Sequence, residues 1–192
     1  MKLVLALTGA SGLIYGMRLA EALHDANNEL HIIVTRAAKK IMKHELGNER
    51  AVLKKLSRFG KLYDEDEMEA PVASGSFRAD AMIICPCSTK TLAAVACGFS
   101  HNLVCRAADV MLKENKKLIL VVRETPLSAI HLENALKLSR LGVVILPASP
   151  AFYPAPKKID ELVDFIIGKI LDSLRIENKL YRRWKDVPLF HK

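Results

Sequence analysis

Short apolar runs of strand length recur along the chain, and longer segments with one apolar face separate them. The strand-like runs are residues 2–7, 30–34, 81–85, 118–122 and 143–146. Between the first two runs, apolar side chains repeat at the helical period at Leu13, Met17, Ala20 and Leu23. A strand, a helix and a strand within 35 residues form a βαβ unit with a parallel, right-handed crossover. The pattern predicts a Rossmann-like, doubly wound α/β fold with a mainly parallel sheet and helices on both faces.

Other segments follow the helical period less strictly. We expect helices over 36–58, with a break near Gly47, and over 89–97, 103–113, 128–141 and 159–170. Residues 59–79 lack a regular period and predict an irregular loop, whose unusual length suggests a functional or interface role. The central strand is expected to end at Cys85, because residues 85–89 are too polar and turn-prone to continue a buried strand.

The length of 192 residues and the 51% hydrophobic content fit one domain over residues 1–192. Within it, residues 176–192 are expected to form a basic tail that closes the active site or an interface. The net charge of +8 permits nucleic-acid binding, but it equally suits a protein that handles small phosphates. Aromatic residues make up only 6% and do not alternate with basic ones, so a nucleic-acid stacking surface is disfavoured.

All four cysteines lie between residues 85 and 105, and the sequence contains no secretory signal and no long apolar run. We therefore expect a cytoplasmic protein without membrane spans. Cys85 and Cys87 are interpreted as small buried hydrophobic residues, because no second ligand pair accompanies them. The histidines are scattered, so we expect no metal site.

In an open parallel sheet, ligands bind beyond the carboxyl ends of the strands. The loops at these ends are residues 8–12, 35–36, 85–89, 123–126 and 149–156. They supply backbone N–H groups, hydroxyl groups, the cations Arg36 and Arg123, and the phenol of Tyr153. Such a set suits a phosphate and an aromatic ring system.

Two common nucleotide motifs are absent from these loops. The glycines at 9, 12 and 16 do not form G-x-G-x-x-G, and the second strand lacks the following ribose-binding acid. No Gly-Lys-Ser or Gly-Lys-Thr follows the first strand, which excludes a P-loop. A NAD enzyme is therefore disfavoured, and the glycine-containing turn alone is weak evidence for a nucleotide site.

Seven ordered motifs across nearly the whole chain resemble the flavin prenyltransferases of the UbiX type. They are TGASG (8–12), APVASGS (70–76), CPCST (85–89), NLVCRAAD (102–109), RETP (123–126), IHLEN (130–134) and FY (152–153). The resemblance implies a flavin-binding, cysteine-decarboxylase-like fold. It also implies metal-independent transfer of a dimethylallyl group from dimethylallyl phosphate to N5 and C6 of reduced FMN. The product, prenylated FMN, would serve UbiD-type decarboxylases, and a homo-oligomer, commonly a dodecamer with active sites at subunit interfaces, is implied.

The resemblance also implies roles for individual residues. Those that hold FMN or its phosphate are Gly9, Ala10, Ser11, Thr35, Ser88, Thr89, Arg106 and Arg123. Those that bind the prenyl phosphate are Lys113, Arg123, Tyr153 and Lys169. Those with catalytic roles are Ser11, Glu45, Glu124, Tyr153 and Trp184. Some members carry arginine in place of Lys169, and lysine keeps the charge but loses the planar donor fork.

These residue types fit an ionising allylic phosphate. Cations and a phenol would neutralise the departing phosphate, and the ring of Trp184 would steady the allyl cation. Ser11, Glu45, Glu124 and the released phosphate are all candidates for accepting the proton lost in the second bond-forming step.

Each residue taken alone has a structural explanation. Lys113 and Lys169 would be solvated helix charges, Ser88 a helix cap, and Arg106 with Asp109 a surface ion pair. Two alternative functions share the fold: an FMN-dependent decarboxylase of the phosphopantothenoylcysteine decarboxylase type, and a non-catalytic flavin-binding subunit. The Pro-x-Met-Asn motif associated with that decarboxylase is absent from the late loop, where the sequence is FYPAP.

Overall fold

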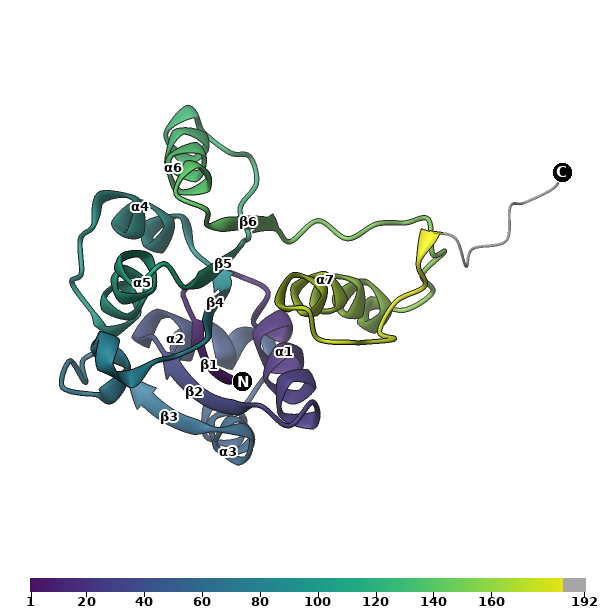
Figure 1. The fold of residues 1–192 in the computed structure, drawn as a ribbon. Helices are drawn as coiled ribbons and strands as arrows, with labels where there is room; N and C mark the ends of the chain where they lie inside the picture. The colour runs from purple at the N-terminus through teal and green to yellow at the C-terminus, as the bar shows by residue number, and fades with distance from the viewer. Residues whose placement is uncertain (185–192) are drawn as a thin grey trace, which may run out of the picture.

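A parallel six-stranded sheet forms the centre of the computed structural model, which describes residues 1–184 (Figure 1). The strands are β1 (Lys2–Leu7), β2 (Glu29–Val34), β3 (Lys61–Asp64), β4 (Ala81–Cys87), β5 (Lys117–Val122) and β6 (Val144–Pro147). Their spatial order is β3-β2-β1-β4-β5-β6, and all neighbours are parallel. The chain therefore changes direction of winding between β1 and β4, as the doubly wound prediction requires.

Helices cover both faces of the sheet, and each face has its own apolar core. One core is formed with α1 (Leu13–Asp25), α2 (Arg36–Glu45), α3 (Glu49–Phe59) and α7 (Ile159–Leu174). The other is formed with α4 (Thr89–Cys97), α5 (Leu103–Lys113) and α6 (Ala129–Arg140). Figure 1 shows α5 and α7 on opposite sides of the sheet. Within residues 1–184, every helix is too short or too polar to cross a bilayer.

The predicted break in the segment 36–58 is confirmed. Helix α2 ends at Glu45, Gly47 adopts a φ of +85°, and the Asn48 side chain accepts a hydrogen bond from Ala51 N as the N-cap of α3. A left-handed residue followed by an N-cap stops one helix and starts the next.

The prediction of an irregular loop over 59–79 is wrong in part, because this segment contains β3 and two 3-10 turns, Pro71–Ala73 and Gly75–Phe77. The strand has four residues at the edge of the sheet, and only Tyr63 in it is buried. So short an edge strand shows too little alternation to be recognised as a strand.

The expected end of the central strand at Cys85 is also wrong. Strand β4 continues through Pro86 to Cys87, which pairs with Val122 after a register shift, and all seven of its residues are buried. Burial raises the pKa of both thiols, so Cys85 and Cys87 act as the small apolar residues that we expected.

Gly16 lets α1 lie directly on the sheet. A Cβ atom at this position would be 2.5 Å from the carbonyl oxygen of Cys85 and 2.9 Å from Cγ of Leu7. We expect Gly16→Ala to lower the free energy of unfolding by about 1–3 kcal/mol through overpacking, although alanine is favoured over glycine in a helix by about 1 kcal/mol. Urea unfolding measures the change. Ala51→Ser, which adds one atom at an exposed site of α3, is the control, and an equal effect of both changes would contradict the packing argument.

Candidate active site

The loops that follow β1 and β4 meet at the point where the strand order reverses, and the buried side chain of Thr8 joins them. Its Oγ1 donates a hydrogen bond to the carbonyl oxygen of Pro86 (2.8 Å) and accepts one from Ser88 N (2.9 Å). The threonine is 1% exposed, so water does not compete for these bonds. The position of each loop is therefore fixed by the other.

A pocket of about 300 Å³ opens above these loops. It is lined by Thr8, Gly9, Ala10, Ser11, Thr35, Ala37, Ser88, Thr89, Lys90, Thr91, Asn102, Arg123 and Glu124. At Gly9, a Cβ atom would lie 2.5 Å from Cβ of Ala37, so glycine is what lets the first loop approach α2. Because Gly9, Ala10 and Ser11 have small side chains, the backbone of the first loop is accessible from the pocket.

Three lining residues are also helix N-caps. Thr35 accepts a hydrogen bond from Ala38 N at the start of α2, Ser88 from Thr91 N at the start of α4, and Asn102 from Cys105 N at the start of α5. Helix α1 begins at Leu13, one residue after the first loop. Four helix N-termini thus converge on the pocket, and their partial positive charges favour an anion.

The N-terminus of α1 already has an anionic partner. Both carboxylate oxygens of Glu45 accept hydrogen bonds from Gly12 N (3.0 and 2.9 Å), and Oε2 also accepts one from Leu13 N (2.9 Å). On the other side of the same loop, Arg123 Nε donates to the carbonyl oxygen of Ser11 (3.2 Å). Glu45 and Arg123 therefore hold the loop that carries Ser11 from both sides.

Glu65 links the starts of two other helices. Its Oε1 accepts a hydrogen bond from Arg36 N (2.8 Å), and its Oε2 accepts one from Asn102 Nδ2 (2.8 Å). Its backbone oxygen accepts a further bond from Leu103 N (2.8 Å). This carboxylate fixes the separation of α2 and α5 across the pocket.

The structure brings most of the predicted flavin-binding residues together. Those that line the pocket are Gly9, Ala10, Ser11, Thr35, Ser88, Thr89 and Arg123, together with Glu124. The predicted residue Glu45 lies behind the first loop. The remaining predicted residues lie in two other places.

Arg106 and Lys113 lie on α5, where it meets the loop over 70–76. Arg106 Nε donates to the carbonyl oxygen of Ala73 (3.0 Å), and Nη1 pairs with Asp109 (2.9 Å). Lys113, the last residue of the helix, pairs with Glu114 (3.0 Å). The ion pair of Arg106 with Asp109 is the one expected from their spacing.

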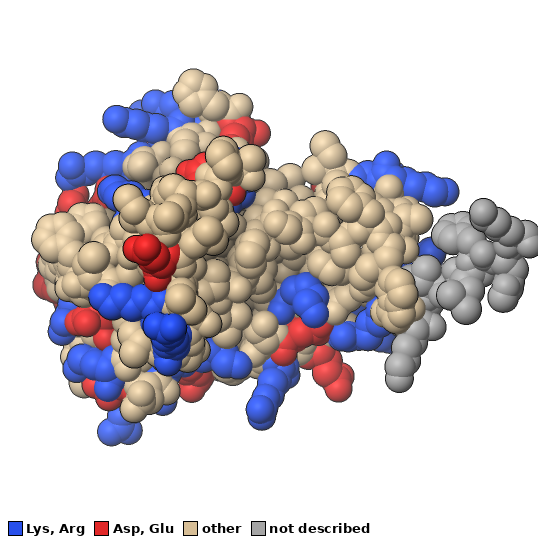
Figure 2. Space-filling view, turned by 90° about the horizontal axis from the view of Figure 1, so that it is seen from above, with Lys and Arg blue, Asp and Glu red and all other residues tan. Residues whose placement is uncertain are grey.

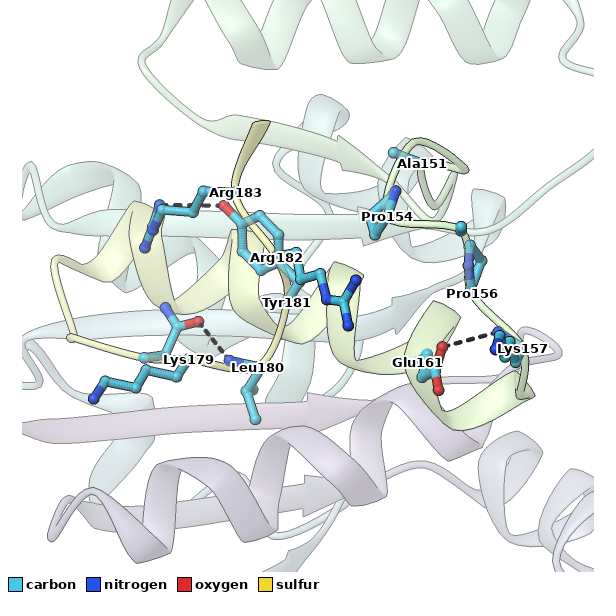
Figure 3. A pocket seen from close by; sticks show the side chains of 12 residues that line it. Ala151, Pro154, Pro156, Lys157, Glu161, Lys179, Leu180, Tyr181, Arg182 and Arg183 are labelled. Atoms are coloured by element: carbon cyan, nitrogen blue, oxygen red, sulfur yellow. Dashed lines mark hydrogen bonds between the residues drawn. The ribbon is translucent and has the colours of Figure 1, made fainter. Parts of the chain in front are cut away.

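Tyr153, Lys169 and Trp184 belong to the late loop, α7 and the tail. The Tyr153 ring packs edge-on against Trp184 (ring centroids 5.0 Å apart) and Phe165 (6.0 Å). A groove of about 710 Å³ separates the late loop from the tail, and Figure 3 shows its lining side chains. The tail is described to Trp184, and residues 185–192 lie outside the described part of the chain.

Sequence reasoning assigned no role in the site to Thr8, Lys90, Thr91, Asn102 or Glu65. Asn102 precedes an apolar helical segment, which is a recognisable N-cap signal. The bridge made by Glu65 joins residues 29 and 37 positions away, and no local pattern reports such a contact.

The family model described as Flavoprotein matches residues 1–171. The flavin prenyltransferase UbiX of Methanocaldococcus jannaschii is 46% identical, over 97% of this chain and 100% of the relative. A crystal structure of AnUbiX (PadA1) with FMN and dimethylallyl pyrophosphate superposes with a TM-score of 0.91 at 42% identity, covering 95% of this chain and 96% of that one.

A dodecameric FMN-dependent UbiX-like decarboxylase from Escherichia coli O157:H7 also superposes with a TM-score of 0.91 at 42% identity. The match covers 96% of this chain and 99% of that one. The chain is thus highly identical to these proteins over almost its full length and shares their fold. It also has a pocket at the point where the strand order reverses. This chain belongs to the UbiX family of flavin prenyltransferases.

Proposed function

We propose that this chain transfers a dimethylallyl group from dimethylallyl phosphate to reduced FMN, and so makes prenylated FMN. The observation that carries the proposal is the pocket at the strand switch, where helix N-termini, hydroxyl groups and Arg123 surround a glycine-containing loop. The AnUbiX relative, crystallised with FMN and a dimethylallyl donor, supports the same ligands here.

The residues of the pocket fit FMN. Its phosphate needs N–H and hydroxyl donors. The N-terminal end of α4 supplies both through Ser88 and Thr89, and Thr35 adds a hydroxyl at the start of α2, where Glu65 already accepts Arg36 N. The N-terminus of α1 is the less suitable phosphate site, because Glu45 already accepts its N–H groups. At Gly9 the absence of a side chain leaves the backbone of the first loop exposed to the pocket, where a ring system can approach it.

Reduced FMN supplies electron-rich ring atoms that form bonds to the dimethylallyl group. The protein must bind this ring, orient the donor beside it, exclude water and stabilise the departing phosphate. Arg123, whose guanidinium is anchored to the Ser11 peptide, is placed to hold negative charge at the edge of the pocket. Ser11 and Glu124 from the pocket, and Glu45 behind it, remain the candidate proton acceptors, together with the released phosphate.

The other two predicted donor-binding cations, Lys113 and Lys169, do not line this pocket. Asn102 lines the pocket at the start of α5, and Lys113 lies eleven residues later, which is about 16 Å along a helix axis. Lys169 lies on α7, on the opposite face of the sheet from α5. We therefore infer that Lys113 and Lys169 complete the pockets of neighbouring copies, as active sites at subunit interfaces would require.

Exposed apolar side chains mark a surface for this assembly. Those around α6 are Leu127, Ile130, Leu132, Leu136 and Leu141, each 43–67% exposed, and Leu138 is the only buried residue of the helix. Figure 2 shows a broad uncharged area across one face of the molecule, with lysine and arginine side chains at its margins. Large exposed apolar patches are typical of protein interfaces. The dodecameric Escherichia coli relative supports a dodecamer here.

The chain belongs to the UbiX family, so we propose that its product is delivered to a UbiD-type decarboxylase. We place the reaction in the cytoplasm, because a reducing compartment preserves both reduced FMN and the four free cysteines.

Anaerobic incubation with reduced FMN and dimethylallyl phosphate tests the reaction. We expect mass spectrometry to detect a flavin adduct heavier by one C5 unit. The same incubation with dimethylallyl diphosphate distinguishes the two donors. Tight FMN binding without an adduct from either donor would overturn the enzymatic proposal and favour a flavin-binding subunit.

Tyr153→Phe tests the role of the phenol in the departure of the phosphate. The ring contacts with Phe165 and Trp184 persist in this variant, so only the hydroxyl is lost. We expect kcat to fall by about 100-fold, as when one donor of a transition-state anion is removed, with unchanged FMN affinity.

The matched control is Tyr63→Phe, which removes a hydroxyl that is 2.9 Å from His31 Nδ1 in the sheet core. We expect this control to lower stability while turnover per folded molecule stays normal. Loss of FMN from the Tyr153 variant, with normal turnover of the remaining complex, would contradict the assigned role.

Leu136→Glu tests the apolar surface on α6. A carboxylate buried between copies has no partner, so we expect light scattering to find particles smaller than the wild-type assembly. Ser57→Glu introduces the same charge on exposed α3 and should leave the assembly intact. An unchanged particle mass for the Leu136 variant would exclude this surface from the interface.

A further inference from the structure

The C-terminal tail folds back along α7 after a tight turn. Arg175 has a φ of +60°, and Ile176 N donates to the carbonyl oxygen of Leu171 (2.9 Å), which reverses the chain. Ile176 and Leu180 then pack against the apolar core. The near part of the tail is therefore held by burial, whereas the far part, residues 181–184, carries the exposed Trp184.

Asp172, in the last turn of α7, binds three side chains of the tail. Its Oδ2 accepts a hydrogen bond from the Tyr181 hydroxyl (2.6 Å), and its Oδ1 accepts one from Asn178 Nδ2 (2.9 Å). Arg183 pairs with both oxygens, at 2.9 and 3.2 Å. Partial burial acts to raise the pKa of Asp172, but the hydrogen bonds from Arg183, Tyr181 and Asn178 outweigh it, and the pKa is lowered. The ionised carboxylate is thus the form that the tail binds.

Gly168, one turn before Asp172, provides the space for the Tyr181 ring. A Cβ atom at this position would be 2.4 Å from Cδ1 of Tyr181. The ring packs in turn on Phe165 (centroids 4.9 Å apart), Phe165 packs on Tyr153, and Tyr153 packs on Trp184. A continuous series of aromatic contacts therefore connects the hydrogen bonds of Asp172 to the late loop.

The tail and the late loop are the two walls of the groove in Figure 3. The tail contributes residues 178–183, and the loop contributes Ala151 and residues 154–157. Figure 3 shows the Arg182 side chain directed into the space between these walls. The position of the tail on α7 therefore decides the width of the groove and the relative positions of Tyr153 and Trp184.

We propose that Asp172 is a positioning residue for prenyl transfer, because it holds the tail on α7 and thereby places Trp184 and Tyr153. This inference builds on the proposed function, in which these two aromatic residues act on the dimethylallyl donor. The carboxylate itself stays away from the reacting atoms and acts through Tyr181, Asn178 and Arg183.

Two variants release the tail by different means. Asp172→Asn replaces an acceptor oxygen by an NH2 group that faces the donors of the tail. Gly168→Ala adds a methyl group under the Tyr181 ring without changing any charge. The apolar contacts of Ile176 and Leu180 remain in both variants, so both proteins should fold.

Asp164→Asn is the matched control. Asp164 lies on the same helix, and its side chain is 24% exposed, like that of Asp172. It pairs with Arg18 on α1 (2.7 Å) and not with the tail.

Limited trypsin digestion and fluorescence report the tail directly in the full-length protein. Cleavage after Lys179 and Arg182 follows the population of the released tail, and we expect it to be about tenfold faster in both variants. Trp184 is the only tryptophan of the chain, so the tryptophan anisotropy of the flavin-free protein should fall as well. The control should behave like the wild type in both measurements.

Steady-state kinetics then test the positioning. If only a tenth of the molecules hold the tail in place, the KM for dimethylallyl phosphate should rise about tenfold, while kcat at saturation changes little. FMN affinity should not change, because none of the described tail residues, 176–184, lines the proposed flavin pocket.

A released tail with an unchanged KM and kcat would overturn the proposal, and so would a control that matches the two variants. If the wild-type protein makes no adduct, the proposed function fails and the positioning role fails with it. The digestion and anisotropy results would in that case still show whether Asp172 holds the tail.

Discussion

The hydroxyl group of Thr8 is the contact on which the pocket depends. It joins the ends of β1 and β4 at the only place where the winding of the described sheet reverses. A valine would fill the same volume but would leave Ser88 N without this partner, and a buried unpaired group costs about 1–3 kcal/mol. The carbonyl oxygen of Pro86 would keep only its bond from Thr8 N (3.3 Å). The loop with Ser11 and the loop with Ser88 therefore keep one relative position, and the proposed flavin site is built on it.

The same residues that start the helices also line the pocket. Thr35, Ser88 and Asn102 each satisfy a helix N-H group, and they present the rest of their side chains and the helix dipoles to the ligand. At α1 the cap comes from a distant residue, Glu45, because Gly12 has no side chain to serve as the cap. Carboxylates therefore already accept N–H groups at two of the four helix starts, from Glu45 at α1 and from Glu65 at α2.

Local signals in the sequence are sufficient to predict most of the sheet. They also predict the part of the candidate site that lies in the loops after the strands. Five of the six strands have clear apolar runs. Because the carboxyl ends of parallel strands meet at one edge, the sequence predicts that Ser11, Thr35 and Ser88 lie together. Strand β3 has four residues with one buried side chain, so it carries no periodicity. Strand β4 runs past its predicted end because Pro86 and Cys87, which start a turn-prone sequence, are buried in the sheet. The bridge made by Glu65 and the tail contacts of Asp172 depend on tertiary structure, which no local pattern reports. The proposed role of Lys113 rests on contacts between copies, which a single sequence does not describe.

The distribution of charge is consistent with the proposal that the donor site is divided among elements. Lys113, Arg123 and Lys169 lie on three separate elements, and gathering three cations around an empty site would be unfavourable in a chain that already carries +8. An anionic ligand offsets that repulsion. If the pockets are completed by neighbouring copies, FMN and the donor phosphate supply the negative charge at the same contacts that α6 and other apolar surfaces stabilise. Ligand binding and assembly must then favour each other by the same free energy, because the coupling between two equilibria is reciprocal. The flavin would thus be both the substrate of the site and part of the force that holds the site together.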